Sequence, residues 1–292
     1  MITRKHLWAC ILSLPMIFTV PGTAIAQDGS EPKDRAAAAK VKMTELFGPD
    51  YKPALADTDP EFAAMRDNLI YGELFYQGTL SDKMRILVNL CGLTAGGYYE
   101  QIADYARAGL RLKVEPIAMK EAVIQTAPYS GIYRAQKSLA ILNEVFTKAG
   151  IKLPLEPQAV TTEENRFAKG QETQLKMYGE RMQKMWDSSP EGQQYLQVGH
   201  LSAYCFGDVF TRSGLTPAER ELLLWSAILT IGGADAQVRS HAVGNINVGN
   251  TKQNLIDVIA LLMPQNGFPR SLTALAIVNQ AVPEPEAVKK PQ

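Results

Sequence analysis

The chain reads YGELFYQGTLSDKMR at residues 71–85 and FGDVFTRSGLTPAER at residues 206–220. The two stretches share a glycine, an acid, a phenylalanine, a leucine, a hydroxyl residue and an arginine, at Gly72/Gly207, Glu73/Asp208, Phe75/Phe210, Leu80/Leu215, Ser81/Thr216 and Arg85/Arg220. A double glycine recurs at 96–97 and 232–233, and PYSGIYRA (128–135) is matched by PQNGFPRS (264–271). The copies are 135 residues apart at first (220 minus 85) and 136 later (267 minus 131). Since solenoid repeats are only a few dozen residues long, this spacing predicts a duplicated domain.

The first 26 residues have the composition of a secretory signal peptide. Residues 4–6 (RKH) are basic, an apolar run follows from 7 to about 20, and AIA at 24–26 is a small-residue cleavage site. We expect cleavage after Ala26 and a periplasmic or secreted protein. No later stretch approaches the ~20 consecutive apolar residues of a membrane-spanning helix, so we expect no membrane span.

The charge balance of the mature chain is close to neutral. The full chain has 30 basic and 30 acidic residues, and removal of 1–26 takes away Arg4 and Lys5, which leaves 28 against 30. Nucleic-acid binding is not expected, because it needs a clustered positive surface. The mature chain keeps Cys91 and Cys205. A disulfide is open to them in an oxidising compartment, but two buried free thiols is the favoured interpretation.

The order of apolar and helix-breaking residues predicts an all-α protein with two similar halves. Ser81 caps a nearly all-apolar core helix that ends at the double glycine of 96–97. The other signals favour helices at 36–47, 59–76, 81–95, 98–110, 116–127 and 132–148, then at 166–186, 191–211, 216–231, 234–247, 251–263 and 268–280. The predicted organisation is a signal peptide (1–26), a first domain (36–148), a linker (149–165), a second domain (166–281) and a disordered tail (282–292).

Several motifs of metal and nucleotide enzymes are missing. The sequence has no Gly-rich phosphate loop, no G-x-S-x-G elbow and no H-E-x-x-H. The two mature histidines, His200 and His241, are too few and too far apart for a histidine-rich metal site. We therefore expect no metal and no organic cofactor.

The chain resembles the carboxymuconolactone decarboxylase family, whose fold is that of the alkylhydroperoxidase D proteins. The second half carries the likeness in LTPAERELLLWSAIL (215–229), SHAVGNINVGNTKQNLIDVI (240–259) and PQNGFPRSLTAL (264–275). The first half carries it in LSDKMRILVNL (80–90), ARAGLRLKV (106–114) and EAVIQTAPYSGIYRAQKSL (121–139). The resemblance implies two tandem alkylhydroperoxidase D-like helical domains related by internal pseudo-symmetry, over about residues 36–280.

The resemblance also narrows the chemistry. Peroxidase-type members of the family have C-x-x-C three residues before a histidine, and the matching positions here are Ala234 and Gln237, or Tyr98 and Gln101 in the first half. A thiol peroxidase is therefore disfavoured, since it needs a thiolate and a resolving thiol.

Decarboxylase-type members work without metal or organic cofactor, and need a cation for substrate carboxylates and a proton donor for the developing carbanion. The resemblance implies His241 as proton donor and Glu221, on the preceding core helix, as the residue that orients it. Arg220 is the first candidate for the carboxylate clamp. Further substrate-binding candidates are Arg239, Arg270, Tyr98 and Tyr105.

The two halves differ at the implied site. Tyr105 stands where His241 stands, and Ile86 stands where Glu221 stands, which indicates one working copy and one scaffold copy. A structural alternative stays open for each candidate. The recurrence of Arg85 and Arg220, for example, also favours a structural pairing with Glu73 and Asp208.

The leading hypothesis is a cofactor-independent lyase of the decarboxylase type, or an isomerase, that acts on a small carboxylated lactone or aromatic-derived compound. The alternative is a non-catalytic periplasmic binding or assembly module, and a thiol peroxidase comes third. Family domains assemble into rings, so the resemblance also implies a homo-oligomer, with a trimer of tandem chains as the natural guess.

Overall fold

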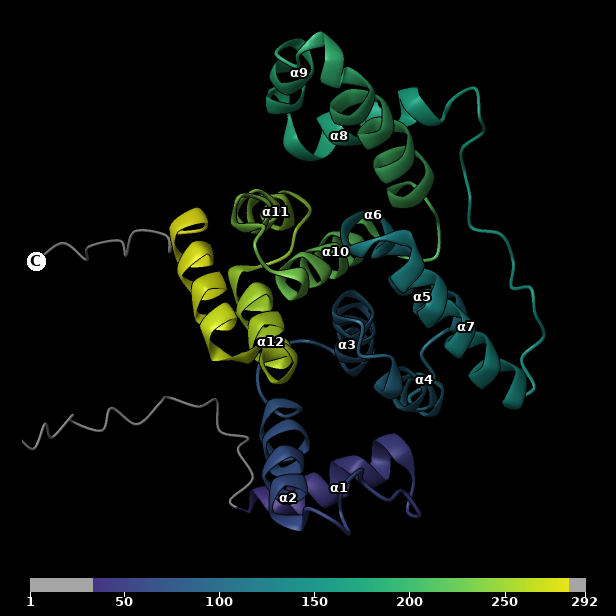
Figure 1. Cartoon of the computed structure of the whole chain (residues 1–292), viewed down its shortest axis with the longest axis vertical. Coiled ribbons are helices and arrows are strands. Elements are labelled where there is room, and N and C mark those ends of the chain that lie inside the picture. Colours follow the sequence, from purple (N-terminus) through teal and green to yellow (C-terminus); the bar gives the residue numbers. More distant parts are fainter. Residues whose placement is uncertain (1–33, 284–292) are drawn as a thin grey trace, which may run out of the picture.

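The computed structural model describes residues 34–283, and within that range every regular element is helical, with no strand (Figure 1). This confirms the predicted all-α class. The predicted signal peptide, and the predicted tail from 284 onward, lie outside the described residues. None of the described helices is long and apolar enough to cross a membrane.

The first half runs through nine helical segments. They are α1 (Arg35–Phe47), α2 (Pro60–Leu69), η1 (Ile70–Leu74), α3 (Asp82–Gly96), η2 (Tyr99–Gln101), α4 (Ile102–Arg111), α5 (Pro116–Gln125), α6 (Ala127–Ser130) and α7 (Ile132–Lys148). A non-helical connection follows and leads to the second half. The core helix α3 begins as predicted, because the Ser81 side chain accepts a hydrogen bond from the Met84 amide.

The second half contains α8 (Arg166–Tyr178), α9 (Glu180–Asp187), η3 (Glu191–Gln193), η4 (Tyr195–Phe210), α10 (Pro217–Ile231), α11 (Asp235–Asn247) and α12 (Lys252–Ala281). The single helix predicted at 166–186 is broken at Gly179, whose φ of 63° and ψ of −155° are not helical. The two helices predicted at 251–263 and 268–280 are present as the two arms of α12, which meet at a kink where Gly267 has a φ of 73°. The break and the kink both lie at glycines, which adopt positive φ without steric cost.

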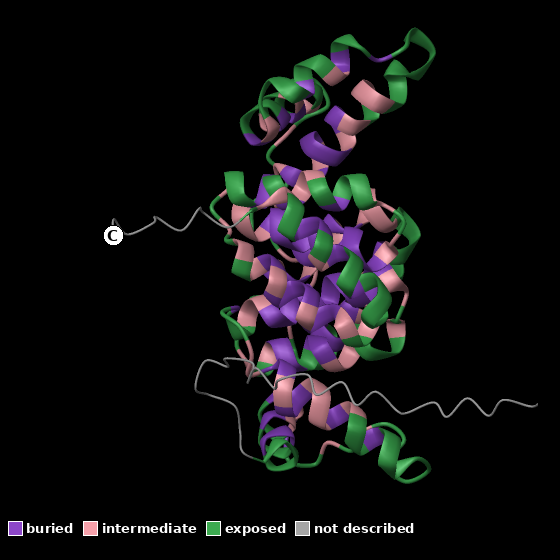
Figure 2. Cartoon of the chain, turned by 90° about the vertical axis from the view of Figure 1, so that its left-hand side faces the viewer, coloured by how far each residue is buried: buried purple, intermediate pink, exposed green. Residues whose placement is uncertain are grey.

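The centre of the molecule is built on α3 and α10, which pack against each other. Both are buried along almost their whole length, from Arg85 to Ala95 in α3 and from Arg220 to Thr230 in α10. Figure 2 shows this buried centre flanked by two projecting ends. One end is formed by α1 and α2 and the other by α8, α9 and η4 (Figure 1). We call the latter, residues 166–210, the upper lobe.

Several contacts recur in the two halves. Arg35 forms an ion pair with Glu73, and Arg166 forms one with Asp208. A Cβ on Gly72 would lie 2.2 Å from the Arg35 carbonyl oxygen, and one on Gly207 would lie 2.1 Å from that of Arg166. Both glycines therefore permit a close helix approach. These contacts support internal pseudo-symmetry, which stays a prediction.

The repeated arginines of the core helices bind other partners than those suggested by the sequence. Glu73 and Asp208 are taken by Arg35 and Arg166. Arg85 instead donates hydrogen bonds to the carbonyl oxygens of Leu80, Leu74 and Gln77.

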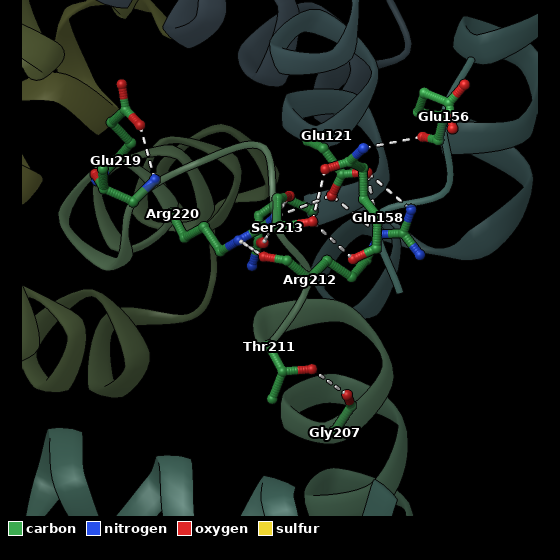
Figure 3. Close-up of polar contacts among 11 residues, drawn as sticks. Glu121, Glu156, Gln158, Gly207, Thr211, Arg212, Ser213, Glu219 and Arg220 are labelled. Carbon is green, nitrogen blue, oxygen red and sulfur yellow. Dashed lines mark hydrogen bonds and ion pairs between the residues drawn. The ribbon is translucent and has the colours of Figure 1, made fainter. Parts of the chain in front are cut away.

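Arg220 belongs to a buried cluster that joins the two halves (Figure 3). Its Nη2 lies 2.9 Å from Glu121 Oε2, and the side chains of Arg220 and Glu121 are 1% and 2% exposed. Arg220 also donates to the Gln125 side chain and to the carbonyl oxygens of Arg212 and Ser213. Arg212 pairs with the other oxygen of the same carboxylate at 2.8 Å. Glu121 thus neutralises two guanidinium groups from the other half.

Replacement of Glu121 by Ala should destabilise the protein by about 3–5 kcal/mol, because it leaves a buried arginine without a counter-charge. Urea unfolding of the mature chain, followed by circular dichroism, measures the change in the free energy of unfolding. The matched control is Lys83→Ala, which breaks the more exposed pair between Lys83 and Glu219 and should cost about 1 kcal/mol or less. Equal losses in the two variants would show that the cluster does not hold the halves together.

Candidate functional site

A cavity of about 580 Å³ lies between the upper lobe and the body of the molecule. Its wall combines apolar and sulfur-bearing side chains with a smaller polar set. The former include Met182, Met185, Leu196, Leu201, Cys205 and Phe206. The latter include Tyr129, Tyr178, Arg181, Gln197, His200, Tyr204, Gln237, Ser240 and His241. The predicted proton donor therefore lies in the wall of a cavity large enough for a small organic molecule.

His241 is bound by two residues, the buried Glu221 and the half-buried Tyr178. Its Nδ1 lies 2.9 Å from Glu221 Oε1 and 2.8 Å from the Tyr178 hydroxyl oxygen. The Tyr178 hydroxyl in turn donates to Glu221 Oε1 at 2.9 Å. The structure thus brings the predicted pair together and adds a third member that sequence reasoning missed.

The three residues come from three helices, and their close approach depends on a glycine. Glu221 is in α10, His241 in α11, and Tyr178 is the last residue of α8. A Cβ on Gly244 of α11 would lie 2.4 Å from Glu221 Oε1 and 2.8 Å from Tyr178 Cε1. Only a residue without a side chain lets α11 pack this closely against the carboxylate.

Burial makes this arrangement directional. The Glu221 side chain is 0% exposed and that of His241 is 12% exposed. A buried carboxylate requires hydrogen-bond donors, so Nδ1 carries its proton toward Glu221. Nε2, on the other side of the ring, is left for the cavity. Burial and the neighbouring Glu221 raise the pKa of Tyr178 well above its ordinary value, so its hydroxyl remains a donor at neutral pH.

Comparison with known proteins finds relatives of this chain. The sequence pattern of the carboxymuconolactone decarboxylase family matches residues 199–280, which contain both Glu221 and His241. The chain is 26% identical over 137 residues to a 4-carboxymuconolactone decarboxylase from Acinetobacter baylyi, covering 44% of this chain and 98% of that protein. The second half of the chain thus matches the carboxymuconolactone decarboxylase family.

A solved structure shows the same fold over most of the chain. It is a provisionally assigned gamma-carboxymuconolactone decarboxylase subunit from Burkholderia xenovorans, which superposes with a TM-score of 0.51 at 17% identity. The match covers 84% of this chain and 97% of that one. At this identity the likeness speaks for the helical fold alone.

The arginines predicted to bind substrate lie outside this cavity. Arg220 is held in the buried cluster with Glu121 and does not line the cavity. Arg239 donates to the Gln280 side chain, and Arg270 donates to the Thr230 carbonyl oxygen. The cavity instead has Arg181, an exposed residue of α9 that sequence reasoning missed.

The first half has no counterpart of the Glu221–His241 pair. Tyr105 is buried, and the Phe47 ring packs against both Tyr105 and Tyr71, with ring centres 6.4 and 5.4 Å apart. Tyr98 is 42% exposed and donates to the Gln265 carbonyl oxygen. Neither Tyr98 nor Tyr105 lines the cavity at His241.

A comparison of the two halves could have pointed to Tyr178. Phe47-Gly48 at the end of α1 corresponds to Tyr178-Gly179 at the end of α8. The hydroxyl of Tyr178 is therefore present only in the half that also has Glu221 and His241. A residue that changes together with the proposed proton donor is a candidate for the same site.

The two cysteines are free and buried. Burial raises the pKa of the Cys205 thiol to about 12 and also raises that of Cys91. These thiols lack the lowered pKa of a peroxidatic cysteine, which disfavours the thiol peroxidase hypothesis. Among residues 34–283 no group of three or more His, Cys, Asp or Glu side chains is placed to hold a metal ion.

We expect both cysteines to resist a chromogenic disulfide reagent at about pH 8 in the folded protein. Their raised pKa values keep them as thiols, whereas the unfolded chain returns them to about 8.5, where thiolate forms. The absorbance of the released reagent measures the reaction, with protein in denaturant as the control. Rapid reaction of the folded protein would show that a thiol is accessible and ionised.

Proposed function

We propose that this protein is a cofactor-independent lyase of the decarboxylase type that acts on a small carboxylated lactone or aromatic-derived compound. The observation that carries this proposal is the Glu221–Tyr178 pair, which binds Nδ1 of His241 and leaves Nε2 for the cavity. The family match over residues 199–280 supports a decarboxylase-like enzyme.

The geometry suits protonation of carbon. When a substrate carboxylate leaves as CO₂, the electron pair of the broken C–C bond stays on the substrate and is delocalised onto a conjugated carbonyl. The imidazolium form of His241 then donates its Nε2 proton to the carbon, and solvent returns that proton. Glu221 orients the ring, because its carboxylate accepts a hydrogen bond at Nδ1 and so directs Nε2 to the substrate.

The rest of the cavity suits a small acid. Arg181 is a cation at its wall, and a guanidinium pairs well with a carboxylate. The methionine and leucine side chains provide an apolar surface for a ring. An isomerase would use the same proton transfer, and release of CO₂ separates the two reactions.

Export and self-association belong to the same proposal. The composition of residues 1–26 supports a periplasmic or secreted enzyme. Large apolar side chains on the projecting ends support a homo-oligomer such as a trimer, since Phe62 and Met65 of α2 and Tyr195 and Leu196 of η4 are all more than half exposed. Light scattering of the mature chain measures its mass.

We expect the mature protein to release CO₂ from 4-carboxymuconolactone or a related lactone acid. His241→Ala should lower kcat by about 10²–10⁴-fold, the usual contribution of general acid catalysis. Glu221→Gln should also lower it, because the amide no longer holds the ring through the carboxylate's hydrogen bond to Nδ1. CO₂ release in a coupled assay measures the rate.

The control is Val243→Ala, which changes an exposed residue of the same helix and should leave the rate unchanged. A thermal-shift screen with lactones, muconates and aromatic acids runs beside the assay, because a ligand that binds only the folded state raises Tm. A ligand that raises Tm without any turnover would favour the binding or assembly module over the enzyme.

A further inference from the structure

One side of the cavity comes from the other half of the chain. Pro128 and Tyr129 of α6 belong to the first half, whereas the remaining wall residues belong to the second. The rings of Tyr129 and His241 meet edge to face, with centres 6.0 Å apart and planes at 87°. The half without the Glu221–His241 pair therefore places a phenol beside the proposed proton donor.

The hydrogen bonds of Tyr129 leave its own proton available. The thiol of Cys205 donates to the Tyr129 hydroxyl oxygen across 3.3 Å. No other contact of that hydroxyl is found within residues 34–283, so its proton has no protein acceptor there. Tyr178 differs, because its hydroxyl already donates to Glu221. Tyr129 thus presents an unused donor in the wall of the cavity.

The protonation state of Tyr129 suits a donor. Burial raises its pKa well above the ordinary value, and the neighbouring Cys205 and Tyr178 add to that shift. The phenol therefore keeps its proton at neutral pH. The matching repeat position is Gln265, whose side-chain amide is engaged with Asn89 in a packed contact. Of these two repeat positions, only that of Tyr129 has a hydroxyl on a residue that lines the cavity at His241.

We propose that Tyr129 is the oxyanion donor of this site and binds the substrate's carbonyl oxygen as it becomes an enolate. The inference rests on the proposed function. It adds the group that stabilises the negative charge on the carbonyl oxygen when CO₂ leaves. As the C–C bond to the carboxylate breaks and CO₂ leaves, the electron pair moves through the conjugated system onto the carbonyl oxygen. The Tyr129 proton is hydrogen-bonded to that oxygen and is not transferred. His241 then protonates the carbon, and the electrons return to re-form the carbonyl.

This assignment restricts the substrate class. A donor at Tyr129 is useful only if a carbonyl group is conjugated with the carbon that loses CO₂. The substrate is then a β-keto acid or a vinylogous relative of one, rather than a simple aromatic acid. Such donors stabilise the transition state because the charge that they bind develops only there.

Binding of 4-nitrophenolate tests the oxyanion donor without any need for turnover. The probe carries an oxyanion on a small ring, and its absorbance changes when it is bound. We expect Tyr129→Phe to weaken its binding by roughly tenfold or more, since a hydrogen bond to a charged group is lost. Tyr133→Phe is the matched control, because Tyr133 is 84% exposed and lies outside the cavity.

Three results would overturn the assignment: unchanged binding in Tyr129→Phe, no binding to the wild type, or binding that depends on Arg181 alone, as measured with Arg181→Ala. If Tyr129→Phe does not fold, the test instead compares two ligands of the wild-type protein, 4-nitrophenolate and nitrobenzene. The wild type should then prefer 4-nitrophenolate over nitrobenzene, which has the same ring without the oxyanion, and equal affinities would contradict the proposal.

Turnover separates this inference from the proposed function. If the protein releases CO₂, Tyr129→Phe should lower kcat by about 10²–10³-fold with little change in KM. Binding of 4-nitrophenolate that depends on Tyr129, without CO₂ release from any lactone acid, would support the oxyanion donor and reject the decarboxylase. CO₂ release that is unaffected by Tyr129→Phe would reject the donor and keep the decarboxylase.

Discussion

The packing of α3 against α10 joins the two halves of the molecule, and one buried carboxylate beside it, Glu121, neutralises Arg212 and Arg220 of the other half. Such an arrangement tolerates little displacement, because charges removed from water require close partners. The fixed position of Arg220 also affects the candidate site, because the next residue in the chain is Glu221. Arg220 and Glu221 are consecutive in α10, and consecutive side chains on a helix point in different directions. When Arg220 is held toward the first half, Glu221 is held toward α11 and His241.

The candidate site is formed by residues from the core, from a helix that covers the core, and from the upper lobe. Glu221 comes from the core, His241 from a helix that covers the core, and Tyr178 and Arg181 from the upper lobe. Tyr178 and His241 both bind Oε1 of the buried carboxylate and so offset part of the cost of its burial. Gly244 permits the approach that brings these donors within reach. Removal of solvent and fixed orientation of His241 therefore follow from the same packing.

Sequence reasoning predicted the core helices well, because their signals are local. Ser81 and Thr216 cap α3 and α10, and the capping box of Thr216 with Glu219 is present in the structure. It missed the break at Gly179, since a glycine within an otherwise helical pattern does not reveal its own φ. It predicted the Glu221–His241 pair from the resemblance to a family. It could not choose among the arginines, because the direction of Arg220 depends on Glu121, 99 residues away.

The residues that complete the cavity could not be predicted from local sequence patterns, because their positions depend on tertiary packing. Tyr129, Tyr178 and Arg181 reach His241 only when the upper lobe and α6 are in place.

The connection at residues 149–165 has a further consequence for a candidate site that takes residues from both halves. If the halves were separate chains, Tyr129 and His241 would come together only when two molecules associated, and dilution would separate them. A covalent tether replaces that encounter by an effective concentration that does not fall with dilution. A tethered pair would still present a complete site at the lowest protein concentrations.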